Sequence, residues 1–334
     1  MSIRFAVLGA GRIGKVHAKA VSGDPDARLV AVADAMPQAA DSLAALWGAQ
    51  VRSVDEILAA DDIDAVVICT PTDTHADLIE RFARAGKAIF CEKPVDLSVD
   101  RVRACLAVVE AESGILMVGF NRRFDPHFQA VRAQIDAGAI GTVEMVTITS
   151  RDPGAPPASY ILSSGGIFKD MTIHDFDMAR FLLGEEPAWV SASAASLVDP
   201  TIGELGDYDS ASVILTTASG RQCVISNSRR ATYGYDQRIE ALGTKGMIAA
   251  ENQRPVSIEI ADERGFTRPP LHDFFMTRYT QAYAAEIAGF IAAIRDGTQP
   301  QPSGRDGLVA LVIAEAALRS VKERRAVNVA EILP

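Results

Sequence analysis

One stretch decides the fold of the first part of this chain: Phe5-Ala6-Val7-Leu8-Gly9-Ala10-Gly11-Arg12-Ile13-Gly14. It has the pattern of a buried strand, a G-x-G-x-x-G turn and the start of a helix. Gly9 permits a tight turn, Gly11 leaves the backbone open to a pyrophosphate, and Gly14 lets the helix pack closely on the strand. We therefore predict a dinucleotide site in which the phosphates lie on the helix N-terminus, with Arg12 and Ile13 in the same turn.

An acidic residue in register with this turn indicates which dinucleotide is bound. Asp34 ends the next apolar run, 20 positions after Gly14. A carboxylate at that place accepts hydrogen bonds from the hydroxyls of an adenosine ribose and repels a 2′-phosphate. The sequence therefore predicts NAD as the cofactor. The alternative is an ordinary glycine-rich turn in which Asp34 only caps the end of a strand.

Length, charge and cysteine content limit the class of protein. With 334 residues the chain is too long for one ordinary core, and its net charge of −10 argues against a nucleic-acid or anionic-membrane surface. The longest apolar stretch near the end, 308–318, is too short to span a bilayer, and the first residues leave no room for a signal peptide. The four cysteines have no metal-ligand spacing. We expect a cytoplasmic protein of two domains that binds no metal.

The order of predicted elements changes near residue 120. Before it, short apolar strands alternate with helices, which predicts an α/β domain over 1–120 with a doubly wound parallel sheet. The strands are predicted at 4–8, 29–33, 65–69, 88–91 and 116–119, and the helices at 14–21, 37–47, 54–59, 74–85 and 98–113.

A second, α+β domain is predicted over 121–334. A helix at 126–137, a strand at 142–150 and a helix at 167–183 are followed by strands without crossover helices. These strands are predicted at 190–197, 211–217, 222–228, 237–242, 247–250 and 256–260, before helices at 276–295 and 305–319. Because short turns join several neighbours, we expect a large, open, mainly antiparallel sheet.

Polar residues after the strands of the first domain are candidates for the site, since ligands of open α/β sheets bind beyond the carboxyl ends of the strands. Thr70 and Pro71 follow one strand, and Glu92 and Lys93 follow the next. Lys93 can donate a hydrogen bond to a substrate hydroxyl, and the alternative is a surface lysine paired with Glu92. His75 begins a helix and is a candidate cofactor contact.

One predicted helix of the second domain carries candidate acid–base residues. Asp170, His174 and Asp177 are spaced i, i+4 and i+7, which places them on one face of a helix. An acid one turn before a histidine can orient the imidazole and stabilise its protonated form, as a general base requires. The alternative is a solvated polar face.

Four further residues complete the candidate substrate contacts. Polyhydroxy ligands need several donors and acceptors together with a flat ring face. The residues that offer these groups are Arg122, Asp152, Tyr233 and Tyr235. A turn or rim position is the alternative for each.

Three motifs in one order resemble the Gfo/Idh/MocA family of NAD(P)-dependent sugar and polyol oxidoreductases. They are Gly9-x-Gly11-x-x-Gly14, Glu92-Lys93-Pro94 and Gly165-Gly166-x-x-x-Asp170-x-x-x-His174-Asp175. The resemblance implies that Lys93 hydrogen-bonds the reacting hydroxyl, that His174 is the general base, and that Asp170 orients His174 or binds the substrate. It also implies a homotetramer with contacts through the open sheet of the second domain.

Longer strings strengthen this resemblance, and what it implies is oxidation of myo-inositol to 2-keto-myo-inositol with NAD. They are Val118-Gly119-Phe120-Asn121-Arg122-Arg123-Phe124-Asp125, Asp170-Met171-Thr172-Ile173-His174-Asp175-Phe176-Asp177, and Asn227-Ser228-Arg229-Arg230-Ala231 with Tyr233-Gly234-Tyr235-Asp236. The alternatives are another polyol or sugar, such as scyllo- or chiro-inositol or a hexose, and a non-catalytic regulator that binds dinucleotide and sugar. The path of the Pro-rich segment 152–157 is not predicted.

Overall fold

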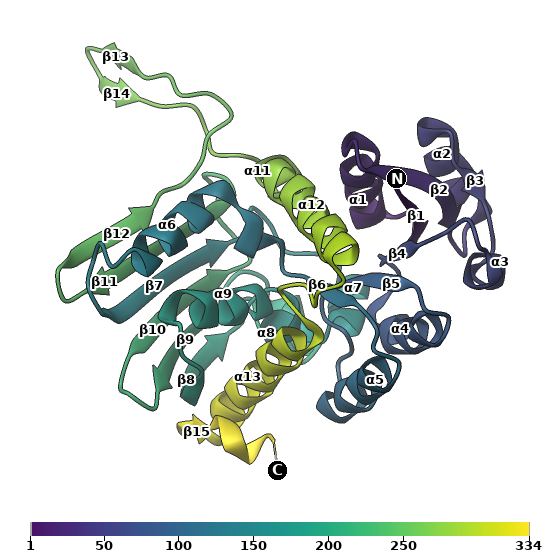
Figure 1. Cartoon of the computed structure of the whole chain (residues 1–334). Coiled ribbons are helices and arrows are strands. Elements are labelled where there is room, and N and C mark those ends of the chain that lie inside the picture. Colours follow the sequence, from purple (N-terminus) through teal and green to yellow (C-terminus); the bar gives the residue numbers. More distant parts are fainter. Residues whose placement is uncertain (1, 334) are drawn as a thin grey trace. The chain divides into compact units, whose positions relative to one another are not determined.

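The computed structural model describes residues 2–333, which form two compact units (Figure 1). The first comprises the chain up to Asp125 together with Thr280–Leu311, and the second comprises Pro126–Tyr279 together with the chain from Val312 onward. We predicted a single division near residue 120. By packing, Thr280–Leu311 belongs with the first unit, so the chain enters that unit twice.

A six-stranded parallel sheet forms the centre of the first unit, in the order β3-β2-β1-β4-β5-β6. Its strands are β1 (Ile3–Leu8), β2 (Ala27–Ala33), β3 (Gln50–Val51), β4 (Ala65–Ile68), β5 (Ala88–Glu92) and β6 (Leu116–Gly119). The predicted doubly wound sheet is confirmed. The order reverses between β1 and β4, and ligands of such sheets bind at the carboxyl ends beside that point.

The connecting helices follow the predicted pattern closely. They are α1 (Arg12–Gly23), α2 (Pro37–Trp47), α3 (Val54–Ala59), α4 (His75–Arg84) and α5 (Val99–Ala111). Short 3₁₀ turns at Thr72–Thr74 and Asn121–Phe124 follow β4 and β6.

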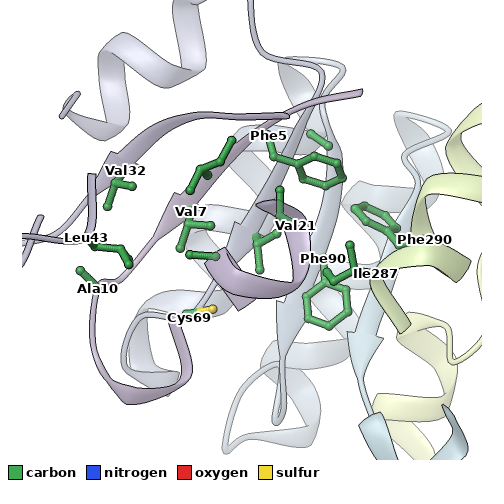
Figure 2. Close-up of a cluster of buried hydrophobic side chains, with 14 of the residues drawn as sticks. Phe5, Val7, Ala10, Val21, Val32, Leu43, Cys69, Phe90, Ile287 and Phe290 are labelled. Carbon is green, nitrogen blue, oxygen red and sulfur yellow. The ribbon is translucent and has the colours of Figure 1, made fainter. Parts of the chain in front are cut away.

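The core of this unit includes a helix from the distant segment, α12 (Thr280–Asp296). Figure 2 shows its Ile287 and Phe290 side chains beside Phe5 and Phe90 of the sheet. The Phe290 ring lies 6.1 Å from that of Phe5 and 5.9 Å from that of Phe90, between centroids. The helix therefore completes the apolar layer on one side of the sheet. Helix α13 (Gly304–Glu323) follows, and the division between the units falls within it.

The second unit contains a seven-stranded sheet in the order β12-β11-β7-β10-β9-β8-β15. Its strands are β7 (Val143–Arg151), β8 (Pro187–Ala195), β9 (Ser210–Thr217), β10 (Gln222–Ser228), β11 (Asp236–Gly243), β12 (Gly246–Ala250) and β15 (Val327–Asn328). The predicted, mainly antiparallel sheet is confirmed. One pair, β7 with β10, is parallel and was not predicted.

The two faces of this sheet differ in what covers them. The unit's helices are α6 (Pro126–Asp136), α7 (Ala158–Ser164), α8 (Gly166–Asp170), α9 (Ile173–Leu183), α10 (Pro200–Glu204) and α11 (Phe275–Arg278). Helix α9 packs on β7 and β10. On the opposite face, the register forms a row across five strands from Leu242 through Met145, Gln222 and Thr216 to Trp189. Leu242, Met145 and Trp189 are exposed, so we call this side the open face.

Local predictions failed at three places in this unit. The helix predicted at 167–183 is two helices separated at Met171-Thr172, where the Thr172 N–H and hydroxyl both donate to the Ile167 carbonyl oxygen, at 2.9 and 3.2 Å. The strand predicted at 256–260 is absent, since Val256 and Ile258 are exposed and lie outside the sheet. The short hairpin of β13 (Ile260–Asp262) and β14 (Gly265–Thr267) begins later. The segment 152–157 leads into α7, which was not predicted.

Candidate active site

The glycine turn between β1 and α1 has the geometry that the sequence predicts. Gly9 has φ +95°, and a Cβ on it would lie 2.5 Å from the Cys69 carbonyl oxygen. A Cβ on Gly14 would lie 1.9 Å from the Gly9 carbonyl oxygen, so both positions require glycine. A Cβ on Gly11 would meet no described atom within 4 Å. Gly11 also caps α1 without a side chain, which leaves an open cradle of backbone N–H groups suited to a pyrophosphate.

Asp34 holds this turn from the end of β2. Its Oδ2 accepts a hydrogen bond from the Ala10 N–H at 2.6 Å, and its Oδ1 accepts one from the Met36 N–H at 2.7 Å. A carboxylate has about four acceptor sites, so lone pairs remain for the hydroxyls of a ribose. The residues present therefore fit the adenosine half of NAD.

The loops after β4 and β5 are tied together by a buried histidine. His75 Nδ1 lies 2.8 Å from the Pro94 carbonyl oxygen, and its Nε2 lies 2.8 Å from the Thr70 carbonyl oxygen. Carbonyl oxygens only accept, so both hydrogen bonds form when both ring nitrogens carry a proton. His75 thus fixes the loop of Thr70 and Pro71 against the Glu92-Lys93-Pro94 turn.

Glu92 anchors the turn that carries Lys93. Its Oε2 accepts a hydrogen bond from the Lys93 N–H at 3.2 Å, and its Oε1 accepts one from His17 Nε2 at 2.7 Å. His17 lies in α1 and is fully buried. The sequence pattern gave no sign of this contact, because the two residues are 75 positions apart.

In the second unit, Asp170 and His174 lie on consecutive helices. Asp170 ends α8 and His174 lies in the first turn of α9, and both are half-buried. The third member of the predicted face, Asp177, is buried and lies 3.7 Å from Arg180 Nη1 in an ion pair. The expected single face is therefore divided by the turn at Met171-Thr172.

Two residues that the sequence did not single out hold the Asp170 carboxylate. The Tyr160 hydroxyl donates to Oδ1 at 2.8 Å, and Arg229 Nη1 lies 3.4 Å from Oδ2. Arg229 is only 1% exposed and also faces Asp207 at 3.7 Å. The only sequence signal was the polar run that follows β10.

The remaining candidate substrate residues lie in different surroundings. Arg122 is buried in the 3₁₀ turn after β6, and the Asp152 N–H donates to the Ser228 carbonyl oxygen at 2.9 Å. Tyr233 is 49% exposed, and its hydroxyl donates to Asp236 at 2.6 Å and accepts from Arg151 at 2.9 Å.

Tyr235 is buried, in contrast to Tyr233. Its ring packs edge-on against those of Phe274 and Tyr279, with centroids 5.7 and 6.0 Å away. The two tyrosines that flank Gly234 therefore face different environments, one at the surface and one in an aromatic cluster.

Within residues 2–333, no group of three His, Cys, Asp or Glu side chains is arranged to hold a metal ion. No helix in the same range combines the length and the apolar character that crossing a membrane requires.

Comparisons with known proteins place this geometry among oxidoreductases. The model of the Gfo/Idh/MocA oxidoreductase family with an NAD-binding Rossmann fold matches residues 3–120, and that of the GFO/IDH/MocA C-terminal domain matches residues 128–249. An inositol 2-dehydrogenase of Rhizobium meliloti (strain 1021) is 73% identical over 330 residues, which cover 99% of this chain and 100% of the relative. A scyllo-inositol 2-dehydrogenase (NAD(+)) of Bacillus subtilis (strain 168) is 40% identical, with 96% and 94% covered.

A solved structure agrees with these matches. The scyllo-inositol dehydrogenase of Lactobacillus casei, with bound cofactor NAD(H) and scyllo-inositol, is similar with a TM-score of 0.92 at 28% identity. The similarity covers 99% of this chain and 100% of that one.

Proposed function

This chain belongs to the Gfo/Idh/MocA family of NAD-binding oxidoreductases, and on that premise we propose that it oxidises myo-inositol to 2-keto-myo-inositol. The observation that carries the proposal is its 73% identity to an inositol 2-dehydrogenase along nearly the whole chain. A second candidate substrate is scyllo-inositol, because a relative at 40% identity is named as a scyllo-inositol 2-dehydrogenase.

The cofactor is held by backbone and carboxylate groups of the first unit. The turn from Gly9 to Gly14, with Arg12 and Ile13, receives the pyrophosphate, and Asp34 receives the adenosine ribose. The loops of Thr70-Pro71 and Glu92-Lys93, with His75 between them, follow β4 and β5 and hold the nicotinamide half. Bound NAD⁺ supplies the hydride acceptor, so the protein itself needs only to position the alcohol and remove its proton.

Proton removal falls to the residues of the third motif. His174 accepts the hydroxyl proton as general base, while Lys93 donates a hydrogen bond to the reacting oxygen. Asp170 binds the substrate or orients His174, and Tyr160 and Arg229 position its carboxylate. Arg122, Asp152, Tyr233 and Tyr235 stay candidates for contacts to the other hydroxyls.

The direct test is NADH formation, followed by its absorbance, with NAD⁺ and a panel of polyols and hexoses. We expect the highest kcat/KM with myo-inositol. If no compound of the panel gives NADH while NAD⁺ binds tightly, the result would instead favour a non-catalytic regulator.

The general base is tested by His174→Ala, which should lower kcat by about 10²- to 10⁴-fold while the Kd for NAD⁺ stays the same. His127→Ala, which changes an exposed histidine of α6, is the matched control. An unchanged kcat in His174→Ala would remove this residue from the mechanism.

We further propose that the chain assembles as a homotetramer in the cytoplasm, with the open face as a contact surface. The row of Leu242, Met145 and Trp189, with Ile214 in the next row, gives that face exposed apolar side chains. Exposed apolar side chains that gather on one surface are typical of an interface. All four cysteines are free thiols, which suits a reducing compartment.

A further inference from the structure

Three titratable side chains meet in the interior of the first unit, behind the turn that carries Lys93. His17 of α1 and Glu286 of α12 are fully buried, and Glu92 at the end of β5 is 9% exposed. The His17 ring lies between the two carboxyl groups, with Nε2 2.7 Å from Glu92 Oε1 and Nδ1 3.9 Å from Glu286 Oε1. We call His17, Glu92 and Glu286 the buried triad.

Glu286 is the unusual member of the buried triad. Neither of its carboxyl oxygens has a hydrogen-bond partner within residues 2–333. A carboxylate buried in this way is costly, and it takes up a proton instead. Burial, and after it the negative charge of Glu92, raise the pKa of Glu286 well above its ordinary range.

The proton count of the buried triad follows from these contacts. Nε2 of His17 donates to the Glu92 carboxylate, whereas Nδ1 lies 3.9 Å from Glu286 Oε1, beyond hydrogen-bond distance. Glu286 therefore keeps its own proton, and with the Glu92 carboxylate the triad carries one net negative charge.

The surrounding groups define the environment of this charge. The thiols of Cys69 and Cys91 are neutral, because burial and the charge of Glu92 raise their pKa values. The Tyr283 ring packs edge-on against His17 at 5.5 Å between centroids, and the Phe90 ring lies 4.8 Å away. The backbone N–H of Lys93 donates a hydrogen bond to the Glu92 carboxylate. The charge is thus fixed in a largely apolar interior.

The buried triad lies on one definite side of the point between β1 and β4 at which the strand order reverses. Asp34 at the end of β2 marks the adenosine half of the cofactor site. Glu92 lies at the carboxyl end of β5, and a Cβ on Gly119 of the neighbouring β6 would lie 3.2 Å from its carboxyl group. The strands β4 to β6 are on the other side of β1 from β2, and therefore on the nicotinamide side.

We propose that the buried triad fixes one negative charge behind the nicotinamide end of the cofactor site and so favours binding of NAD⁺ over NADH. This inference rests on the cofactor site proposed above. The nicotinamide ring is cationic in NAD⁺ and neutral in NADH, so a fixed negative charge stabilises only the oxidised form. Such a charge acts strongly in a low-dielectric interior. His17 is a positioning residue, since it acts by holding the Glu92 carboxylate.

The test compares the Kd values of NAD⁺ and NADH, measured by calorimetry without polyol, in three proteins. Glu92→Gln keeps the shape of the side chain and removes the charge, so the ratio Kd(NADH)/Kd(NAD⁺) should fall on the order of tenfold relative to the unchanged protein. Glu286→Gln replaces a neutral acid by a neutral amide, so its ratio should stay within about twofold of the unchanged protein. A merely structural role of Glu92 would weaken both cofactor forms alike and leave the ratio constant.

Each result decides the proposal. A constant ratio in Glu92→Gln overturns it, and an equal fall in Glu286→Gln would place the charge on Glu286 and overturn the proton assignment. If Glu92→Gln does not fold, the infrared difference spectrum between the unchanged protein and Glu286→Gln tests the proton assignment instead. Glu286→Gln must lose a protonated-carboxyl band, and a spectrum without that loss overturns the proposal. If the unchanged protein binds neither NAD⁺ nor NADH, the proposed cofactor site itself is refuted. The outcome of the polyol panel does not affect the ratio Kd(NADH)/Kd(NAD⁺), so the two proposals are tested separately.

Discussion

Asp34 combines two functions that mutation can separate. Its carboxylate accepts a hydrogen bond from the Ala10 N–H of the glycine turn, and we propose that it also binds a ribose and repels a 2′-phosphate. We predict that Asp34→Ala raises the KM for NAD⁺ and improves the relative use of NADP⁺. Asp34→Asn keeps an acceptor for Ala10 without the charge, so it should improve NADP⁺ use with a smaller loss of NAD⁺ affinity. Steady-state kinetics with both cofactors measure this, and an unaltered NAD⁺/NADP⁺ preference in both variants would contradict it.

Glu286 also has a consequence for stability that does not depend on any ligand. The folded state holds its proton above the pH at which the unfolded chain releases it, near 4.3. Because the folded state then binds more protons, the free energy of unfolding falls as pH rises. We predict that Glu286→Gln becomes more stable than the unchanged protein by up to about 1.4 kcal/mol for each pH unit above about 5, until the folded pKa is reached.

Urea unfolding at several pH values between 5 and 8 measures this difference. Glu263→Gln, which changes an exposed glutamate between β13 and β14, is the control for the substitution itself. A stability difference that stays constant with pH would show that Glu286 is ionised in the folded protein.

At the scale of elements, the turn between β1 and α1 offers a matched pair of glycine substitutions. Gly14→Ala forces a Cβ against the Gly9 carbonyl oxygen, and we predict a loss of about 1–3 kcal/mol in stability together with weak cofactor binding. Gly11→Ala meets open space, so it should keep the melting temperature and lose only affinity for NAD⁺. Thermal melting and calorimetry distinguish the two, and equal destabilisation would contradict the prediction.

The elements that the sequence predicted well are those with a local signal. The strands of the first sheet are short apolar runs between caps and turns, and the glycine pattern places its turn without any distant information. By contrast, the pairing of β7 with β10 joins residues about 77 positions apart, such as Ser150 and Asn227, and no local pattern encodes it. The alternation of Val256, Ile258 and Ile260 resembles a strand, but of the three only Ile260 pairs within residues 2–333, with Thr267 of the short hairpin.

The candidate site divides in the same way. Lys93, Asp170 and His174 lie in recognisable motifs, whereas the groups that hold them come from elsewhere. Tyr160 reaches Asp170 from α7, a helix that the sequence did not predict, and Glu286 lies 269 positions after His17. Supporting contacts of this kind depend on tertiary packing, which single-sequence patterns do not contain.

At the scale of the whole molecule, the open face makes a prediction about assembly. Ile214 is 46% exposed on this face and lies in β9. Ile214→Glu puts a charge into the proposed contact, so we predict smaller particles by light scattering with an unchanged circular dichroism spectrum. Leu46→Glu on α2, where the leucine is 68% exposed, is the control and should leave particle size unaltered. Equal particle sizes for Ile214→Glu and the unchanged protein would exclude this face as a contact.

The return of α12 to the first unit bears on how the chain is made. Phe5 and Phe90 leave the ribosome early, but the Ile287 and Phe290 side chains that cover them follow after the second unit's main segment, 126–279, has been translated. At about 5–20 residues per second, this interval lasts roughly 8 to 30 s. Throughout it the nascent sheet keeps an uncovered aromatic surface. The rings of a newborn chain therefore stay without their final cover until translation is nearly finished.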